Sequence, residues 1–169
     1  MDFIDIYDEN RRRTGVVRQR EEPRQPGEYG LAVCVWVYDG KGNLLLTRRA
    51  PEKSFAGTWE NSGGAAQAGE DSLTAIVREL WEETGIQADA DEFEYLCSSR
   101  SDSFFFDHYC LHRDISLDKI KLLPGETDDV MWASFETVHD YIHKKKICHI
   151  IAEQFLQMES ELLRRQTAQ

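Results

Sequence analysis

The chain has 169 residues, of which 41% are hydrophobic, 11% aromatic and 30% charged, and this composition is typical of one folded globular unit rather than of a disordered or fibrous protein. Its formal net charge of −11 argues against binding to a nucleic acid polymer or an anionic membrane, because the mean field would repel both. We therefore expect a small-molecule partner, and a phosphate-bearing partner would need metal ions.

The N-terminal region predicts a hairpin followed by a linker. A polar turn at residues 8–11 separates two short apolar stretches, so residues 3–20 are expected to form two paired strands. Two prolines and a glycine among charged residues predict an irregular linker over 21–28. We expect residues 1–28 to form this hairpin and linker, and residues 29–169 to form the main domain.

The next segment predicts buried strands and then a loop. Residues 31–38 are β-branched and aromatic, and the glycine-containing turn 39–43 separates them from apolar residues 44–47, which is the pattern of a buried hairpin. Residues 50–63 are rich in Pro, Gly, Ser and Trp. They predict a loop that leads to a helix and offers ligand contacts.

The clearest helical period lies in residues 72–84, where apolar side chains recur every three or four positions. Asp71 or Ser72 is expected to cap the start of this helix, and Gly85 is expected to end it. The side chains expected to face the core are Leu73, Ile76, Val77, Leu80 and Trp81.

The remaining sequence predicts further strands at 93–98, 103–111 and 130–133, and helices at 135–145, with Ser134 as cap, and at 149–165. Strands that alternate with helices indicate an α/β sandwich. The last helix is expected to pack on the domain, although its apolar face would also suit the seam of a homodimer. That face comprises Ile150, Ile151, Phe155, Leu156 and Leu162.

The cysteines and the apolar runs indicate the cellular compartment of the protein. The four cysteines lie far apart without a C-x-x-C pair, and the first residues are acidic rather than signal-like, which predicts reduced thiols and a cytoplasmic protein. The longest apolar run, residues 31–38, is too short to cross a bilayer as a helix, so we expect no membrane association.

Chemistry concentrates on the helix over 72–84. Glu79, Glu82 and Glu83 stand at positions i, i+3 and i+4, so their side chains share one helical face and repel one another. A divalent cation would convert this repulsion into binding. Hard oxygen ligands on one face suit Mg²⁺ or Mn²⁺, which keep some waters and complete their shell with substrate phosphates.

Neighbouring residues predict support for these carboxylates. Arg78 is placed to pair with Glu82 or with Glu70, which indicates an orienting role. Gly63 and Gly64 permit a positive φ or a close approach of the backbone, and a carbonyl in their loop is a candidate metal ligand.

Residues 64–86 match the Nudix box, G-x5-E-x7-R-E-U-x-E-E-x-G-U with U a bulky apolar residue, at every defined position. The chain therefore resembles the Nudix hydrolases, and most of residues 30–140 fits the layout of that family. The resemblance implies an α/β/α sandwich with a mixed β-sheet. It also implies hydrolysis of a nucleoside diphosphate linked to another moiety, in which a carboxylate-oriented water attacks phosphorus while Mg²⁺ or Mn²⁺ neutralises the phosphate oxygens.

Carried onto this sequence, the resemblance assigns roles to single residues. Metal binding falls to Glu79, Glu82 and Glu83 with a carbonyl of Gly64 or its neighbour, and the supporting role falls to Glu70 and Arg78. The general base is either Glu79 or a residue outside the box, for which Glu126 is the candidate, with Asp128 and Asp129 close behind. The cations Arg48, Arg49 and Lys53 are candidates for a clamp on a distal phosphate, and an ordinary surface role suits them equally.

Two alternative functions stay open. The N-terminal region and the stretch 44–64 are also similar to isopentenyl-diphosphate isomerases. However, Gly63 and Ala65 stand where those enzymes carry a catalytic cysteine and histidine, and Gly30 stands near the position of a second histidine. The second alternative is a nucleotide-binding Nudix module without catalysis. Such modules usually lose box glutamates, and this chain keeps them all.

Two clusters on the strand at 103–111 have undecided roles. His108, Cys110 and His112 alternate and share one face, but His108 and His112 would lie about 13 Å apart, so a structural or substrate-facing role is favoured over a metal site. The three phenylalanines at 104–106 suit either the core or a surface on which a base stacks, and the core is the default.

Overall fold

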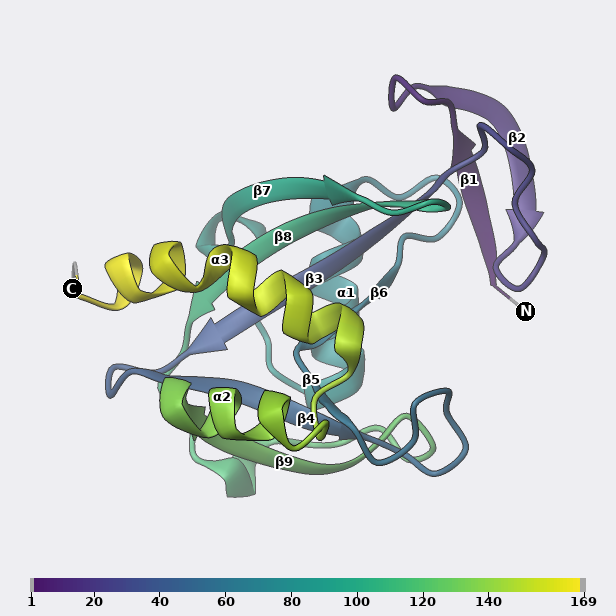
Figure 1. The fold of residues 1–169 in the computed structure, drawn as a ribbon. Helices are drawn as coiled ribbons and strands as arrows, with labels where there is room; N and C mark the ends of the chain where they lie inside the picture. The colour runs from purple at the N-terminus through teal and green to yellow at the C-terminus, as the bar shows by residue number, and fades with distance from the viewer. Residues whose placement is uncertain (1, 168–169) are drawn as a thin grey trace.

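A seven-stranded mixed sheet forms the centre of the computed structural model, which describes residues 2–167 (Figure 1). The main strand order is β5-β4-β3-β8-β7, with β6 paired to β3 and β9 paired to β4. The β3–β8 pair is parallel and the other pairs are antiparallel. The strands are β3 (Gly30–Tyr38), β4 (Asn43–Arg49), β5 (Trp59–Glu60), β6 (Ser62–Ala65), β7 (Glu94–Arg100), β8 (Phe104–His112) and β9 (Thr127–Ser134).

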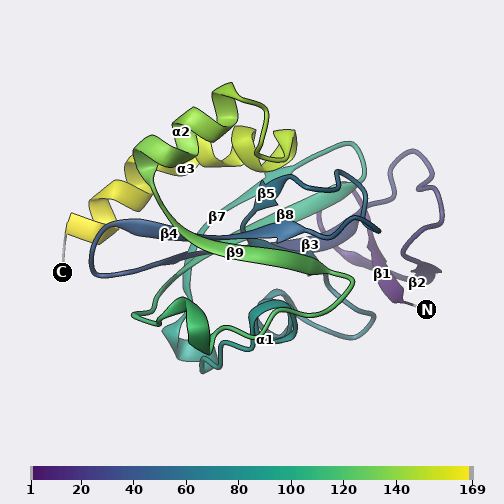
Figure 2. The same cartoon turned by 90° about the horizontal axis from the view of Figure 1, so that it is seen from below.

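Helices cover both faces of this sheet. Figure 2 shows α1 (Ser72–Thr84) on one side, and α2 (Phe135–His143) and α3 (His149–Thr167) on the other. Each helical layer buries its own apolar cluster against the sheet, one around Val35 and Leu80 and the other around Trp36 and Phe155. Side chains at neighbouring positions of β3 therefore pack into opposite cores, because successive side chains of a strand point to opposite faces of the sheet. The predicted α/β/α sandwich with a mixed sheet is confirmed.

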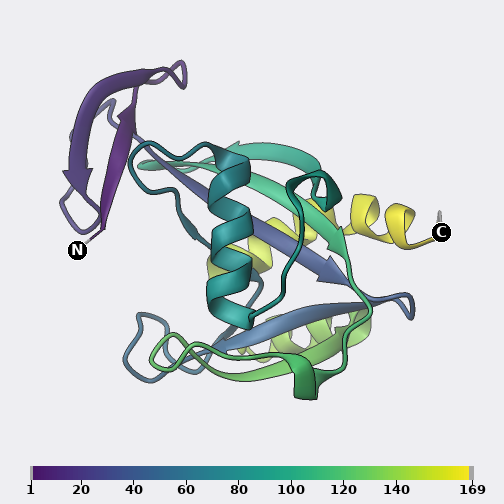
Figure 3. The same ribbon diagram turned by 180° about the vertical axis from the view of Figure 1, so that it is seen from behind.

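The two strands of the predicted hairpin, β3 and β4, separate directly after the turn that joins them. Tyr38 and Leu44 form the one registered pair between the two strands, after which β3 pairs with β8 and β6 while β4 pairs with β9. Figure 3 shows the two strands diverging from this end. All nine residues of β3 are buried, so the strand lies centrally and takes partners from distant parts of the chain. The predicted loop 50–63 also contains β5 and the start of β6.

The N-terminal hairpin is present as β1 (Phe3–Tyr7) and β2 (Arg13–Gln19), which form a separate two-stranded antiparallel sheet. It lies at the end of the sandwich remote from the last turn of α3 (Figure 3). Backbone bonds tie it to the loop before α1, where Ala68 N donates to Phe3 O at 2.8 Å. Ile4 and Ile6 are buried against Ala65. The hairpin is therefore packed beside the Nudix box.

The helix ends follow the sequence closely. The Asp71 side chain accepts from Thr74 N at 2.7 Å at the start of α1, and Gly85, at φ 70°, ends the helix. Ser134 caps α2 in the same way. Trp81 was expected in the core but is 55% exposed, because it lies at the edge of the stripe formed by Ile76 and Leu80.

The C-terminal helix packs on the domain through part of its predicted apolar face. Phe155 and Leu162 are fully buried, and the Phe155 ring lies 5.7 Å from that of Trp36. Ile150 and Leu156 were expected on this face but are 38% and 52% exposed. Within residues 2–167, no helix has the length and apolarity needed to span a membrane.

Candidate active site

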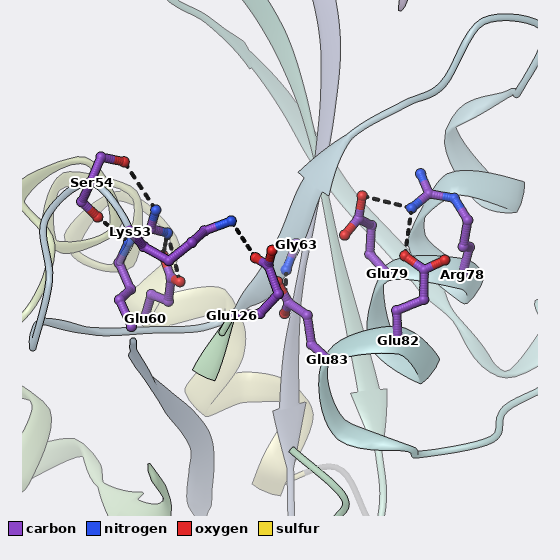
Figure 4. A network of polar contacts seen from close by, with 10 residues as sticks. Lys53, Ser54, Glu60, Gly63, Arg78, Glu79, Glu82, Glu83 and Glu126 are labelled. Carbon is purple, nitrogen blue, oxygen red and sulfur yellow. Dashed lines mark hydrogen bonds and ion pairs between the residues drawn. The ribbon is translucent and has the colours of Figure 1, made fainter. Parts of the chain in front are cut away.

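The three glutamates of α1 line one cavity of about 350 Å³. Its other walls come from the N-terminal hairpin, which contributes Arg20, and from the segment before β9, which contributes Glu126. The fold thus gathers Glu79, Glu82, Glu83 and Glu126 around one hollow. Figure 4 shows Glu79 and Glu82 turned toward Arg78, while Glu83 accepts from Gly63 N and Glu126 pairs with Lys53.

Arg78 holds the carboxylates of the Nudix box together. Its guanidinium donates to both carboxylate oxygens of Glu70 at 2.7 and 2.9 Å, to Glu79 at 2.9 Å and to Glu82 at 3.0 Å. A further bond reaches Ala65 O at 3.3 Å. Burial opposes ionisation of Glu70, but the hydrogen bonds from Arg78 and from Gln67 N outweigh it and lower its pKa. These are the contacts that the predicted orienting role of Arg78 would require.

Glu83 is the carboxyl group that this environment ionises least readily. Part of its side chain faces the cavity, but protein atoms crowd its carboxyl group, and this desolvation raises its pKa well above 4.5. The nearby charges of Glu60 and Glu79 raise the pKa further, although Gly63 N donates to Glu83 at 3.2 Å. Burial also raises the pKa of Glu79. A cation in the cavity would stabilise both carboxylates in their charged forms.

The two glycines before the box permit close approach rather than a positive φ. A Cβ on Gly64 would lie 2.4 Å from Glu79 Oε1, and a Cβ on Gly63 would lie 2.2 Å from Val33 O. Both distances are shorter than real side-chain contacts. Glycine is therefore needed at position 63, where the clash is with the backbone of β3, and a side chain at position 64 would displace the Glu79 carboxylate.

The cations predicted to clamp a distal phosphate are all paired with acids of the chain. Arg48 Nε donates to Asp128 at 2.7 Å, Arg49 Nη1 donates to both Glu60 oxygens at 2.7 Å, and Lys53 forms an ion pair with Glu126. The Arg48 and Arg49 pairs connect β4 to β9 and to β5, and the Lys53 pair connects the loop after β4 to the segment before β9. They provide structural links around the cavity, whatever further role the cations have.

Arg20 is a cavity residue that the sequence reasoning missed. It lines the carboxylate cavity, and its charge lowers the pKa of Glu79 in opposition to burial. Its backbone N–H donates to Asp2 O at 2.8 Å, which fixes the end of the hairpin. The signal available in the sequence was the cluster of arginines in the predicted hairpin and linker. Nothing local showed which of them would face the box.

The donor set suits a hard divalent cation. Within residues 2–167, no three His, Cys, Asp or Glu side chains converge into a ready metal cage. Three carboxylates nevertheless share one cavity wall, and the carboxyl group of Glu83 is desolvated, so its charge needs compensation. Mg²⁺ and Mn²⁺ accept few protein oxygens and take water and substrate oxygens for the rest of their shell. The residues present fit such an ion.

His108 makes buried polar contacts with Cys34 and Ser99 and, among residues 2–167, is not part of a metal site. Its Nδ1 lies 2.9 Å from Cys34 Sγ, and its Nε2 lies 2.8 Å from Ser99 Oγ. Burial lowers the pKa of His108 to about 4 and raises the pKa of Cys34 to about 12, so both groups are neutral near pH 7. A neutral thiol is a poor nucleophile, so this pair is not an activated dyad.

Together, the three-layer fold and the complete box define a Nudix-fold protein. The sequence profile of the NUDIX domain matches residues 28–153. An uncharacterised Nudix hydrolase from Listeria monocytogenes is 31% identical over 138 residues, which span 80% of this chain and 82% of the relative. Nudix hydrolase 3 from Arabidopsis thaliana is 30% identical over 88% of this chain and 21% of its own length. This chain belongs to the Nudix hydrolase family.

Other relatives agree with the resemblances found in the sequence. The isopentenyl-diphosphate isomerase of Pectobacterium atrosepticum is 37% identical over 84 residues, 48% of this chain and 46% of that enzyme, which confirms the predicted relationship. Among solved structures, a Deinococcus radiodurans protein has a TM-score of 0.80 at 24% identity, with 92% of this chain and 98% of that chain covered. This structural likeness supports the fold assignment.

Proposed function

We propose that the protein hydrolyses a phosphoanhydride bond in a nucleoside diphosphate derivative, with Mg²⁺ or Mn²⁺ as its cofactor. The observation that carries this proposal is the gathering of Glu79, Glu82 and Glu83 on one wall of a cavity, held by Arg78 behind an intact Nudix box. Nothing in the packing of α1 requires three acids there, whereas cleavage of a polyanion requires a site that concentrates cations.

Glu79, Glu82 and Glu83 would hold the divalent ion, with a backbone carbonyl of Gly64 or its neighbour as a further ligand. When bound, the ion supplies neutralisation of the phosphate oxygens and a lower pKa for water. Glu70 and Arg78 keep the carboxylates in place and do not touch the substrate. Because Arg78 already bonds to Glu79 and Glu82, little reorganisation is needed when the substrate enters.

A carboxylate of the chain must accept the proton of the attacking water. Glu79 within the box and Glu126 across the cavity are the two candidates, and both line the same hollow. Lys53 pairs with Glu126 and holds it at the cavity wall. Cleavage of the phosphoanhydride bond by this water then yields two phosphorylated products, one of them a nucleoside monophosphate.

The isomerase alternative receives no support from the site. Gly63 and Ala65 occupy β6 at the positions where the isomerases carry their cysteine and histidine, and the space beside Gly63 is filled by Val33 and Cys34. A binding module without turnover would not need the full carboxylate set. Hydrolysis therefore accounts for more of the residues present.

The direct test is product formation from a panel of diphosphates. We expect nucleoside diphosphate derivatives to release a monophosphate in the presence of Mg²⁺ or Mn²⁺, and we expect EDTA to abolish this release because the carboxylates alone repel the substrate. Anion-exchange chromatography of the products from nucleotide sugars, ADP-ribose, NADH, CoA, nucleoside triphosphates and prenyl diphosphates measures it. Tight nucleotide binding without turnover under any metal would instead establish the binding module.

Arg20 is expected to contribute a phosphate contact from outside the NUDIX profile. The Arg20→Met variant should lower kcat/KM about tenfold, mainly through KM, because a charge-assisted hydrogen bond to the substrate is lost. Arg12→Met removes another arginine of the same hairpin, one that does not line the carboxylate cavity, and is the matched control. Steady-state kinetics of the two variants test this role. Equal kcat/KM values for Arg20→Met and Arg12→Met would show that Arg20 makes no such contact.

A further inference from the structure

A second cavity of about 320 Å³ adjoins the carboxylate cavity. The two share Arg20 and Ala65, so β6 and the end of the hairpin form their common border. The second cavity lies on the face of the sheet that α3 covers. Its walls include Cys34, Asn61, Phe104, Phe106, Ile150 and Gln154. A ligand whose diphosphate lies among the glutamates would thus have space for its organic part past Arg20.

Asn61 lines this second cavity and carries an unsatisfied side-chain amide. The residue is only 3% exposed, and neither its Nδ2 nor its Oδ1 has a hydrogen-bond partner. Several described side chains bury an unpaired polar atom, but Asn61 is the one among them that lines either cavity. Asn61 does interact with the Cys34 thiol, but a thiol is a weak hydrogen-bonding group. A buried amide without partners is destabilising, so its presence points to a ligand that pairs with it.

The other walls of this cavity suit a flat ring. Phe55, Phe104 and Phe106 bring aromatic surface to it, and Phe55 is 49% exposed although it lines the cavity. Of the three phenylalanines at 104–106, Phe105 alone is buried in the core, whereas Phe104 and Phe106 on either side of it line the cavity. Gln154 adds a second carboxamide, and it is 6% exposed.

We propose that Asn61 is a specificity-determining residue, whose amide pairs with the hydrogen-bonding edge of a nucleobase seated between β8 and α3. This proposal rests on the proposed function, since it places the diphosphate of the same substrate among the box glutamates. A base with adjacent donor and acceptor groups satisfies both Asn61 atoms at once. A prenyl chain would leave both atoms unpaired and is disfavoured for that reason.

The experiment is a titration of ¹⁵N-labelled protein followed by NMR, with AMP, GMP, CMP and UMP as probes and ribose 5-phosphate as the probe without a base. The Asn61 side-chain NH₂ signals are assigned by their absence in Asn61→Leu. We expect at least one nucleotide to shift these signals and to bind at least tenfold more tightly than ribose 5-phosphate. In Asn61→Leu, nucleotide affinity should fall about tenfold while ribose 5-phosphate affinity stays unchanged.

Two further measurements keep the result interpretable. The control is Gln157→Leu, which removes an exposed carboxamide of α3 that does not line the cavity. This variant should bind nucleotides like the wild type. Wild-type protein that binds ribose 5-phosphate or geranyl diphosphate as tightly as every nucleotide overturns the assignment of Asn61, even if Asn61→Leu does not fold. Because binding is measured without turnover, failure of this assignment and failure of the proposed hydrolysis are distinguishable.

Discussion

Replacement of Glu83 by glutamine is expected to lower turnover about 100-fold or more, and Glu79→Gln should do the same. Glutamine keeps the size of each side chain but removes a charge that the divalent cation needs. The fold should stay intact, because burial and the charges around Glu83 already raise its pKa and disfavour its ionised form in the cation-free protein. Steady-state rates with saturating Mg²⁺, together with urea unfolding in EDTA, measure both expectations.

The matched control is Glu136→Gln. Glu136 is an exposed acid in the first turn of α2, on the opposite side of the sheet from α1, so its loss should leave turnover unchanged. Rates near wild type in both Glu79→Gln and Glu83→Gln would refute the assignment of the metal site. Glu126→Gln then separates the two candidate bases: a loss as large as that of Glu79→Gln favours Glu126, and a small loss favours Glu79.

The second large effect concerns stability in acid and involves His108. Its pKa is lowered from 6.5 to about 4 in the folded protein, mainly by burial, with the charge of Asp107 acting in the opposite direction. Because the folded pKa lies below the unfolded one, the stability contributed by the neutral ring is complete above pH 6.5. It is lost as the pH falls toward 4, at about 1.4 kcal/mol per pKa unit.

Other groups also titrate in acid, so the His108 effect must be read as a difference between variants. Between pH 7 and pH 4.5, the free energy of unfolding of His108→Gln should fall about 2 kcal/mol less than that of the wild type, since glutamine does not ionise. His143→Gln controls for the loss of an imidazole that the fold does not bury. Parallel urea-unfolding results for His108→Gln and the wild type would show that His108 is not held neutral by the fold.

The sequence by itself determined the helix that carries the chemistry. The bounds of α1 agree with the prediction because both of its ends are set locally: the Asp71 carboxylate accepts from Thr74 N, three residues away, and Gly85 adopts a positive φ that other residues disfavour. The common face of Glu79 and Glu83 also follows from local geometry, since 3.6 residues per turn place positions i and i+4 together.

Only the tertiary structure decided what surrounds that helix. Arg20 and Asn61 lie 59 and 18 positions before Glu79 (79 − 20 and 79 − 61), and no periodicity connects them to it. They reach the site because β3 leaves β4 to pair with β8 and β6, and because the hairpin packs on the loop before α1. Such contacts depend on the summed burial of whole elements, so the residues that meet there leave no trace in the spacing of the sequence.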